Sequence, residues 1–291
     1  MRIAIIGASN AEETRLLEKE AQKRNWEVLS IGLRDLIFIA EIPPKVIYND
    51  KNFVNCIDAV IFRGMTKNPN ENLILANLLN QRGIRVIDNR LATSRYLTTK
   101  MATSFNLAQK NINHPKTLFT TNPKNLNRIL NNLEFPIIVK DIVGKHSKGV
   151  YRFQEESEIT EFFKTKKIKD FIFQEDLKTN EYYRVFTIGY KTIGVIKRVK
   201  ISSLNSSGNV SGVRSKQIKP KAELIEIAEK AAKIVNNEIC GLDIIEKNGK
   251  FYIIEANRAP QFKAFSEKTG INVAEKILNY VQETTKSKKI A

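Results

Sequence analysis

The sequence predicts a protein of mixed α/β and α+β class that begins with an open, mainly parallel sheet. Over about the first 95 residues, short apolar runs typical of strands alternate with amphipathic stretches typical of helices, which is the βαβ pattern. Beyond residue 95, strand candidates come in pairs joined by short turns, with helices between the pairs. We therefore expect a βαβ domain over residues 1–95, followed by units that combine hairpins with helices.

The elements of the first domain follow from their apolar periodicity. Gly83 ends the second helix, because glycine commonly follows the last helical turn. The expected strands are 2–10, 27–32, 58–64 and 84–88, and the expected helices are 11–25 and 70–83.

The elements of the remaining chain are marked by caps and turns. Asn122 and Ser157 are placed to cap helices, and Pro123 suits the first turn of the first of these. Asn248-Gly249 is a strong signal for a tight hairpin turn. The expected elements are helix 89–111, helix 122–133, two strands within 135–153, helix 157–168, strand 171–177, a hairpin over 182–200, a polar loop over 202–217, helix 221–236 and a hairpin over 241–260.

Composition excludes several kinds of protein. Hydrophobic residues make up 42% and charged residues 27%, which is ordinary for a globular protein. No apolar run approaches the ~18–20 residues that a membrane span needs, so a cytoplasmic location is expected. With two histidines and two cysteines, a multi-histidine metal site or a Ser-His-Asp triad is improbable. A metal would be held by Asp, Glu and Asn oxygens, the ligands of Mg²⁺.

The formal charge of +17 and a pI of about 9.7 favour anionic partners. The alternative is a lysine-rich surface without a dedicated partner, since the lysines are dispersed apart from runs at 164–169 and 286–289. Both interpretations stay open.

The last hairpin carries the strongest chemical signal. Asp243 lies on its first strand, and Glu255 and Asn257 end its second strand, where residues i and i+2 face the same side. Two carboxylates and an amide oxygen suit Mg²⁺, which takes its remaining ligands from water and phosphate. An ordinary hairpin with exposed acids is the alternative.

A second signal is a lysine followed by a glycine-bearing turn. Lys140 ends the run "PIIVK", and Gly144 and Gly149 follow, so backbone N–H groups can approach phosphate. It is not a Walker A loop, because Val150 stands where that loop has its lysine. The alternative is a hairpin turn with solvated lysines. Farther along, Arg184 and Arg198 on adjacent strands are suited to clamp a phosphate or a carboxylate.

Taken in order, these motifs resemble the ATP-grasp superfamily, and the RimK-type ligases most closely. The resemblance rests on Lys100, "PIIVK", the glycine loop, "FQED", "YYR", "IKR", "NVSG", "GLDII" and "IIEANRAP". It implies a two-subdomain ATP-grasp fold after the first domain, with boundaries at 1–95, 96–175 and 176–291. It also implies an ATP-dependent carboxylate–amine ligase that works through an acyl-phosphate and releases ADP and phosphate.

The resemblance implies roles for particular residues. Asp243, Glu255 and Asn257 would hold Mg²⁺, with Mn²⁺ as a substitute. Arg198 and Arg184 would stabilise the developing oxyanion. The ATP-binding residues would be Lys100, Lys140, Lys148, Gly149, Glu175, Asp176, Leu177, Glu181 and Asn209. Departures from the family pattern include Lys145, His146 and Ser147 in the loop, Tyr182 in "EYYR", and "EANRAP" where "EVNxxPG" is usual.

The substrates are less well marked. Arg63, Asn89 and Arg90 follow parallel strands at the edge where ligands collect. Gly212 lies in a loop, 202–215, that is either a lid that closes over the site or a solvated linker. The implied partners are an amino acid, with glutamate favoured, and a carboxylate-bearing small molecule, peptide or protein tail. Nucleic acid is not required, no membrane is expected, and family analogy suggests a homo-oligomer.

Two other functions compete with the ligase. A non-catalytic nucleotide-binding or regulatory module with a basic partner-binding surface would fit the glycine-poor loop. A Rossmann oxidoreductase is suggested by "IAIIGASN", but that stretch has one glycine, Gly7, where the fingerprint needs three.

Overall fold

The computed structural model describes residues 1–7, 10–65, 68–94, 99–142, 149–200 and 213–290. Within these ranges the strands form four sheets, and the fold is a mixed α/β and α+β arrangement as predicted.

The N-terminal sheet is parallel throughout, with the order β2-β1-β6-β7. Its central strand β1 is buried because Ile3, Ala4, Ile5 and Ile6 pack on both faces of the sheet. Its strands are β1 (Arg2–Ile6), β2 (Glu27–Ile31), β6 (Ala59–Phe62) and β7 (Arg85–Ile87), and the helices beside it are α1 (Glu12–Gln22), α2 (Pro69–Gln81) and α3 (Asn89–Thr93). The predicted βαβ arrangement is confirmed.

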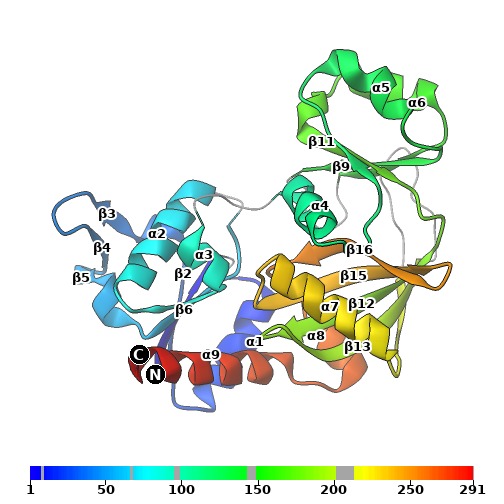
Figure 1. The fold of residues 1–291 in the computed structure, drawn as a ribbon. Helices are drawn as coiled ribbons and strands as arrows, with labels where there is room; N and C mark the ends of the chain where they lie inside the picture. The colour runs from blue at the N-terminus through cyan, green and yellow to red at the C-terminus, as the bar shows by residue number, and fades with distance from the viewer. Residues whose placement is uncertain (8–9, 66–67, 95–98, 143–148, 201–212, 291) are drawn as a thin grey trace.

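A small antiparallel sheet, for which the sequence carried no prediction, is inserted after β2. Its order is β3-β4-β5, and it projects from the N-terminal domain at the end of the molecule away from β15 and β16 (Figure 1). Its strands are β3 (Ile37–Ile39), β4 (Lys45–Tyr48) and β5 (Lys51–Asn52), flanked by 3₁₀ turns at Leu33–Asp35 and Phe53–Cys56.

The central sheet is antiparallel, with the order β10-β9-β11-β8. Its helices pack on one face, where Phe153, Phe171 and Phe173 are buried. Its strands are β8 (Thr117–Leu118), β9 (Ile137–Asp141), β10 (Val150–Phe153) and β11 (Phe171–Glu175), its helices are α5 (Leu126–Leu130) and α6 (Glu156–Phe163), and 3₁₀ turns lie at Pro123–Asn125 and Ile168–Asp170.

Two local predictions in this region need correction. The helix expected from residue 122 begins as a 3₁₀ turn, with Asn122 accepting from Lys124 N, and becomes α-helical at Leu126. Ser157 is not a cap: α6 starts after Glu155, and the Ser157 hydroxyl donates to the Glu155 carboxylate instead.

The C-terminal sheet is antiparallel, with the order β14-β13-β12-β15-β16. Both predicted hairpins are present, and Asn248 and Gly249 adopt the left-handed φ values of 51° and 73° that such a turn needs. Residues 213–217, expected to be loop, form an edge strand. The elements are β12 (Glu181–Ile188), β13 (Lys191–Lys200), β14 (Val213–Gln217), α7 (Ala222–Ile234), β15 (Ile239–Lys247), β16 (Lys250–Asn257) and α8 (Lys263–Thr269).

The helical stretch expected over 89–111 is divided. Helix α3 ends at Thr93, and α4 (Lys100–Gln109) starts after Thr99, whose hydroxyl accepts from Ala102 N at 3.2 Å. Leu107 and Ile112 pack into the core that the C-terminal sheet shares with α7, so α4 is anchored on that sheet and lies between it and the central sheet (Figure 1).

Helix α9 (Val273–Ile290) joins the first and last sheets. It runs along the base of both, against α1, β7 and β12 (Figure 1). Ile277 and Val281 share one core with Ile3 of β1 and Phe186 of β12. The N-terminal domain and the C-terminal sheet are therefore held by a common hydrophobic core.

Among the described residues, no helix combines the length and the apolar content that crossing a bilayer would require.

Candidate active site

The predicted metal ligands lie together on one face of the C-terminal sheet. Asp243 of β15 is directly opposite Glu255 of β16, and Asn257 lies opposite Gly241. A β-bulge follows at once, because Ile244 pairs with Ile253 and leaves Ile254 as the extra residue. The bulge sets the register that places both carboxylates and the amide on the same side.

Arg184 pairs with Asp243 across the neighbouring strands β12 and β15. Its Nε lies 2.8 Å from Asp243 Oδ1, and its Nη2 donates to Oδ2 at 3.1 Å. Both side chains are largely buried, at 15% and 9% exposed. The carboxylate face of the site thus has a fixed positive neighbour.

Gly241 leaves the space in which Arg184 lies. A Cβ at this position would come within 2.7 Å of both Arg184 Nη1 and Pro260 Cβ. A side chain here would displace the guanidinium or the segment that follows β16.

Arg198 of β13 continues the positive side of the site. It lies opposite Tyr182 of β12 and hydrogen-bonds the phenol. Burial raises the pKa of Tyr182, and nearby Asp243 raises it further. The phenol is therefore neutral, and it lies among Arg198, Arg184 and Asp243.

Lys100, the first residue of α4, connects this sheet with the central one. Burial lowers the pKa of its amine, while Glu255 of β16 and Asp141 of β9 act in the opposite direction. The Lys100 amine is thus placed between the acid of one sheet and the acid of the other.

The glycine-bearing turn has a contact that the sequence interpretation missed. Lys140 and Asp141 end β9, and Asp141 N donates to Gly149 O at 2.7 Å. Gly149 has φ +77°, and a Cβ there would clash with the Asp141 carboxylate. Burial raises the pKa of Asp141, whereas Lys100 lowers it. The sequence did contain a signal for this contact: Asp141 ends the strand and directly follows Lys140, the phosphate-binding candidate.

The residues expected near a nucleotide base follow β11. Glu175 Oε1 accepts from Lys116 N at 2.9 Å, and Asp176 forms an ion pair with Arg152 at 2.6 Å. Leu177 is buried, while Glu181 is exposed and pairs with Lys197 at 2.5 Å. The three acids therefore have partners within the protein: Glu175 a backbone N–H, and Asp176 and Glu181 basic side chains.

The predicted substrate residues lie at the junction of the N-terminal domain and the C-terminal sheet. Arg63 donates to Pro260 O at 3.0 Å and lies over the Phe262 ring, 5.4 Å from its centroid. Arg90 donates to Val235 O at 2.8 Å. Burial lowers the pKa of both guanidinium groups. Both guanidinium groups donate to backbone carbonyls at this junction.

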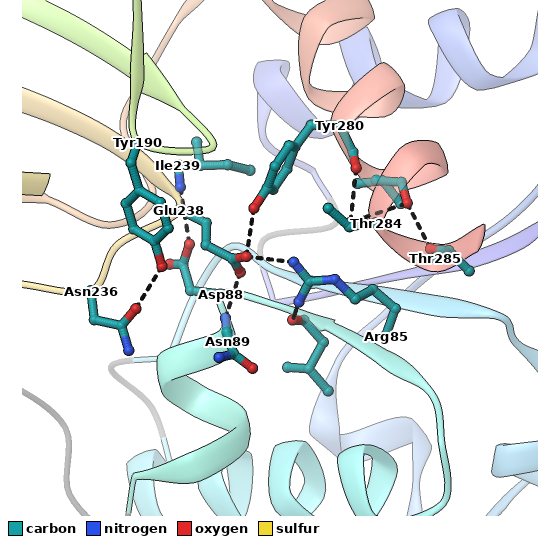
Figure 2. A network of polar contacts seen from close by, with 12 residues as sticks. Arg85, Asp88, Asn89, Tyr190, Asn236, Glu238, Ile239, Tyr280, Thr284 and Thr285 are labelled. Carbon is teal, nitrogen blue, oxygen red and sulfur yellow. Dashed lines mark hydrogen bonds and ion pairs between the residues drawn. The ribbon is translucent and has the colours of Figure 1, made fainter. Parts of the chain in front are cut away.

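Asn89 belongs to a buried polar network at the same junction (Figure 2). Its backbone N–H donates to the Glu238 carboxylate at 2.6 Å. The same carboxylate forms an ion pair with Arg85 at 2.5 Å and accepts a hydrogen bond from the Tyr280 hydroxyl at 2.6 Å. Asp88 accepts from Ile239 N at 3.0 Å in the same group. The network ties β7 to β15 and α9, which the sequence did not indicate.

Lys148, Asn209 and Gly212 lie outside the described residues, as does most of the expected lid.

The donor set fits Mg²⁺. Two carboxylates and an amide oxygen share one face, and these are ligand types that Mg²⁺ takes. Asp243, Glu255 and Asn257 are therefore the candidate ligands for such an ion. Among the described residues, no group of three or more His, Cys, Asp or Glu side chains is arranged to hold a metal ion.

Comparison with known proteins decides the family. Residues 98–281 match the RimK-like ATP-grasp domain, which is more than half of the chain. The chain belongs to the RimK-like ATP-grasp family. It is accordingly an ATP-dependent ligase, as the motif order implied.

Relatives of this ATP-grasp ligase match over nearly their whole length. The chain is 28% identical over 287 residues to the alpha-aminoadipate--LysW ligase LysX of Saccharolobus solfataricus, covering 94% of this chain and 98% of that protein. It is 25% identical over 291 residues to a probable alpha-L-glutamate ligase of Trichodesmium erythraeum, with 97% and 96% covered.

Solved ATP-grasp structures share the fold. The ATP-grasp ligase PsnB, complexed with a phosphomimetic variant of its minimal precursor, Mg and ADP, superposes with a TM-score of 0.73 at 16% identity, covering 97% of this chain and 98% of that chain.

Proposed function

We propose that this ligase joins an amino acid, with glutamate favoured, to the carboxyl group of a small molecule, a peptide or a protein tail. The observation that carries the proposal is the arrangement on one sheet face: Asp243 opposite Glu255, Arg184 paired with Asp243, and Lys100 beside Glu255. The positive side chains would bind phosphate oxygens, and the negative ones would bind the cation that accompanies the phosphate.

The reaction proceeds in two steps. An oxygen of the substrate carboxylate attacks the γ-phosphorus of ATP, the bond to ADP breaks, and an acyl-phosphate forms. The amine nitrogen then attacks the acyl carbon, the carbon–oxygen bond to phosphate breaks, and the nitrogen loses a proton to give the amide. The protein contributes positioning and charge neutralisation to both steps.

The residues have distinct parts in these steps. Asp243, Glu255 and Asn257 would hold Mg²⁺, which would supply neutralisation of phosphate charge. Lys100 and Lys140 bind phosphate oxygens, and the backbone around Gly149 approaches them. Arg198, with Arg184, stabilises the oxyanion of the tetrahedral intermediate. Glu175, Asp176 and Leu177 would contact the base and ribose.

The substrate assignment is supported by two observations. The relatives named above are ligases of alpha-aminoadipate and of alpha-L-glutamate, both dicarboxylic amino acids. The formal charge of +17 favours an acidic acceptor, because a basic surface concentrates anionic partners.

Thermal unfolding with ATP and Mg²⁺ tests the site. A ligand at ~100 times its dissociation constant stabilises a protein by about 2.7 kcal/mol. We expect a shift that needs both Mg²⁺ and ATP and that Glu255→Gln abolishes. The matched control is Glu246→Gln on the same hairpin. Glu246 is not one of the predicted ligands, and its carboxylate forms an ion pair with Lys221 at 2.5 Å.

Product analysis then tests the reaction. With glutamate and an acidic acceptor, release of ADP and phosphate supports the ligase. Release of AMP and pyrophosphate contradicts the acyl-phosphate route. If Mg²⁺ and ATP bind but no pair of glutamate with an acidic acceptor yields phosphate, the proposed substrates are wrong.

A further inference from the structure

A tyrosine lies beside both arginines of the candidate active site. Tyr182 and Arg184 are two residues apart on β12, so their side chains face the same side of the sheet. Arg198 of β13 lies directly opposite Tyr182, and Asp243 of β15 lies directly opposite Arg184. Residues that are directly opposite on antiparallel strands share a face. The Tyr182 phenol therefore has Arg198 on one side and the Arg184–Asp243 pair on the other.

The two arginines differ in the charge of their partners. Arg184 contacts the Asp243 carboxylate through Nε at 2.8 Å and through Nη2 at 3.1 Å, so the two charges largely offset each other. Arg198 donates instead to the Tyr182 phenol, which is uncharged near neutral pH. The phenol can thus hold the Arg198 guanidinium in place without neutralising it.

Arg198 also has a donor that is not used within the protein. Its Nε is buried and has no hydrogen-bond partner in the part of the chain that the structure describes. Leaving a buried donor of a charged group unpaired is costly, so an acceptor should be supplied by a ligand. A negatively charged oxygen is the acceptor to which a guanidinium bonds most strongly. The unpaired Nε–H supports the proposed part of Arg198 in binding an oxyanion.

We propose that Tyr182 is a positioning residue for Arg198. Its phenol oxygen accepts an N–H of the guanidinium and fixes the plane of that group. The remaining donors of Arg198 then point at the oxygen that becomes negative when the amine attacks the acyl-phosphate. A donor that is already in place stabilises this transition state without having to reorganise as the charge develops. The inference rests on the proposed function, because that function assigns the oxyanion to Arg198.

Steady-state kinetics of Tyr182→Phe are the first test. The substitution removes the phenol oxygen and keeps the ring, so the fold should be retained. We expect kcat for amide formation to fall by roughly 10–100-fold, because a misplaced catalytic group costs up to about 10²-fold. KM for ATP should change by less than about twofold, because the oxyanion exists only after ATP has bound and reacted.

Tyr183→Phe is the matched control. Tyr183 is the next residue of β12 and faces the opposite side of the sheet, where its hydroxyl donates to the Glu246 carboxylate at 3.0 Å. The same atom is removed from the same strand, but Arg198 keeps its partner. This variant should have the kcat of the wild-type protein.

A double variant shows whether Tyr182 acts through Arg198. Arg198→Met should lower kcat by about 10²–10³-fold, as loss of one oxyanion donor does. In that background Tyr182→Phe should have no further effect, because the effects of residues that act as a unit are not additive. The proposal is overturned if the two losses multiply, or if Tyr182→Phe is as fast as the wild-type protein.

NMR of the arginine side chains tests the contact without any turnover. The signal that is lost in Arg198→Met identifies the Nε–H of Arg198. Rotation of its guanidinium about the Nε–Cζ bond should be roughly 10-fold faster in Tyr182→Phe than in wild type or Tyr183→Phe, as loss of a hydrogen bond to a charged group allows. Equal rotation rates in the three proteins overturn the proposal. If the wild-type protein forms no amide, the proposed function fails, and the rotation rates still decide whether Tyr182 holds Arg198.

Discussion

At the scale of residues, the site depends on a buried ion pair that the sequence did not predict. Arg184 and Asp243 were each singled out, one as a clamp and one as a metal ligand, but their 2.8 Å contact depends on strands 59 residues apart pairing in register. Taking both charges out of water is costly, and their mutual attraction offsets that cost. Asp243 therefore carries a protein counter-charge on the face where a cation would bind.

Arg184→Met removes that counter-charge. We expect the free energy of unfolding to fall by about 3–5 kcal/mol without metal, because a buried carboxylate loses its partner. With Mg²⁺ and ATP the loss should be smaller, since the cation replaces the guanidinium as the neighbour of Asp243. Chemical denaturation with and without Mg²⁺ and ATP measures the difference.

Arg85→Met is the matched control for this measurement. Arg85 pairs with Glu238 at 2.5 Å and is also buried, but this pair lies at the junction of the N-terminal domain and the C-terminal sheet and includes none of the predicted ligands. Mg²⁺ and ATP should not selectively restore the unfolding free energy that this variant loses. Equal restoration of both variants would mean that Asp243 does not bind the ion.

At the scale of elements, the β15–β16 hairpin determines how the ligands are presented. The turn at Asn248-Gly249 sets the pairing of the two strands as far as Ile244. The bulge between Asp243 and Ile244 then shifts the pairing by one residue, so that Asp243 lies opposite Glu255. The turn was predictable, since Asn-Gly is the strongest short hairpin signal. The bulge was not, because the apolar alternation of the strands has no marker for an extra residue.

Gly249→Ala tests the turn. Gly249 has φ +73° and no atom within 4 Å of an added Cβ, so backbone strain is the whole effect. We expect a loss of about 1–2 kcal/mol in unfolding free energy, and a smaller loss for Gly249→Asn, because asparagine tolerates the left-handed region. Equilibrium denaturation measures both, and equal stability of wild type and Gly249→Ala would contradict the assigned turn.

At the scale of the whole molecule, the parts are joined by a shared core and a buried polar network. Helix α9 packs beneath the first and last sheets, and Glu238 gathers Arg85, Tyr280 and the backbone of Asn89 (Figure 2). Arg258, partly buried nearby, donates to Phe62 O at 3.0 Å. The predicted division at 1–95, 96–175 and 176–291 stays a proposal, and these contacts cross its first boundary.

Asp88 makes this junction sensitive to pH. Burial raises the pKa of its carboxyl from 3.8 to about 7, while Arg258 opposes the rise. Between these two pH values the folded state binds more protons than the unfolded state, so the free energy of unfolding falls as pH rises. Asp88→Asn should remove on the order of 1 kcal/mol or more of that fall.

The measurement is the difference between wild type and Asp88→Asn in unfolding free energy from pH 4 to pH 8. Taking the difference cancels the contributions of the other carboxyl groups to the pH dependence. Several of these groups, such as Glu229 and Glu246, have lowered pKa values, so they make the free energy of unfolding rise with pH. A difference that is constant with pH would show that Asp88 is ionised throughout.

The sequence by itself determined the βαβ order of the first domain apart from its inserted sheet, the parallel first sheet, both late hairpins and the family. These follow from local patterns: apolar periodicity, turn residues and the spacing of motifs. Only the tertiary structure decided that Arg184 lies against Asp243, that Asp141 packs on Gly149, and that residues 37–52 form an exposed sheet. Such contacts join residues far apart or depend on what is left uncovered, and the free energy of burial that selects them is a property of the assembled molecule.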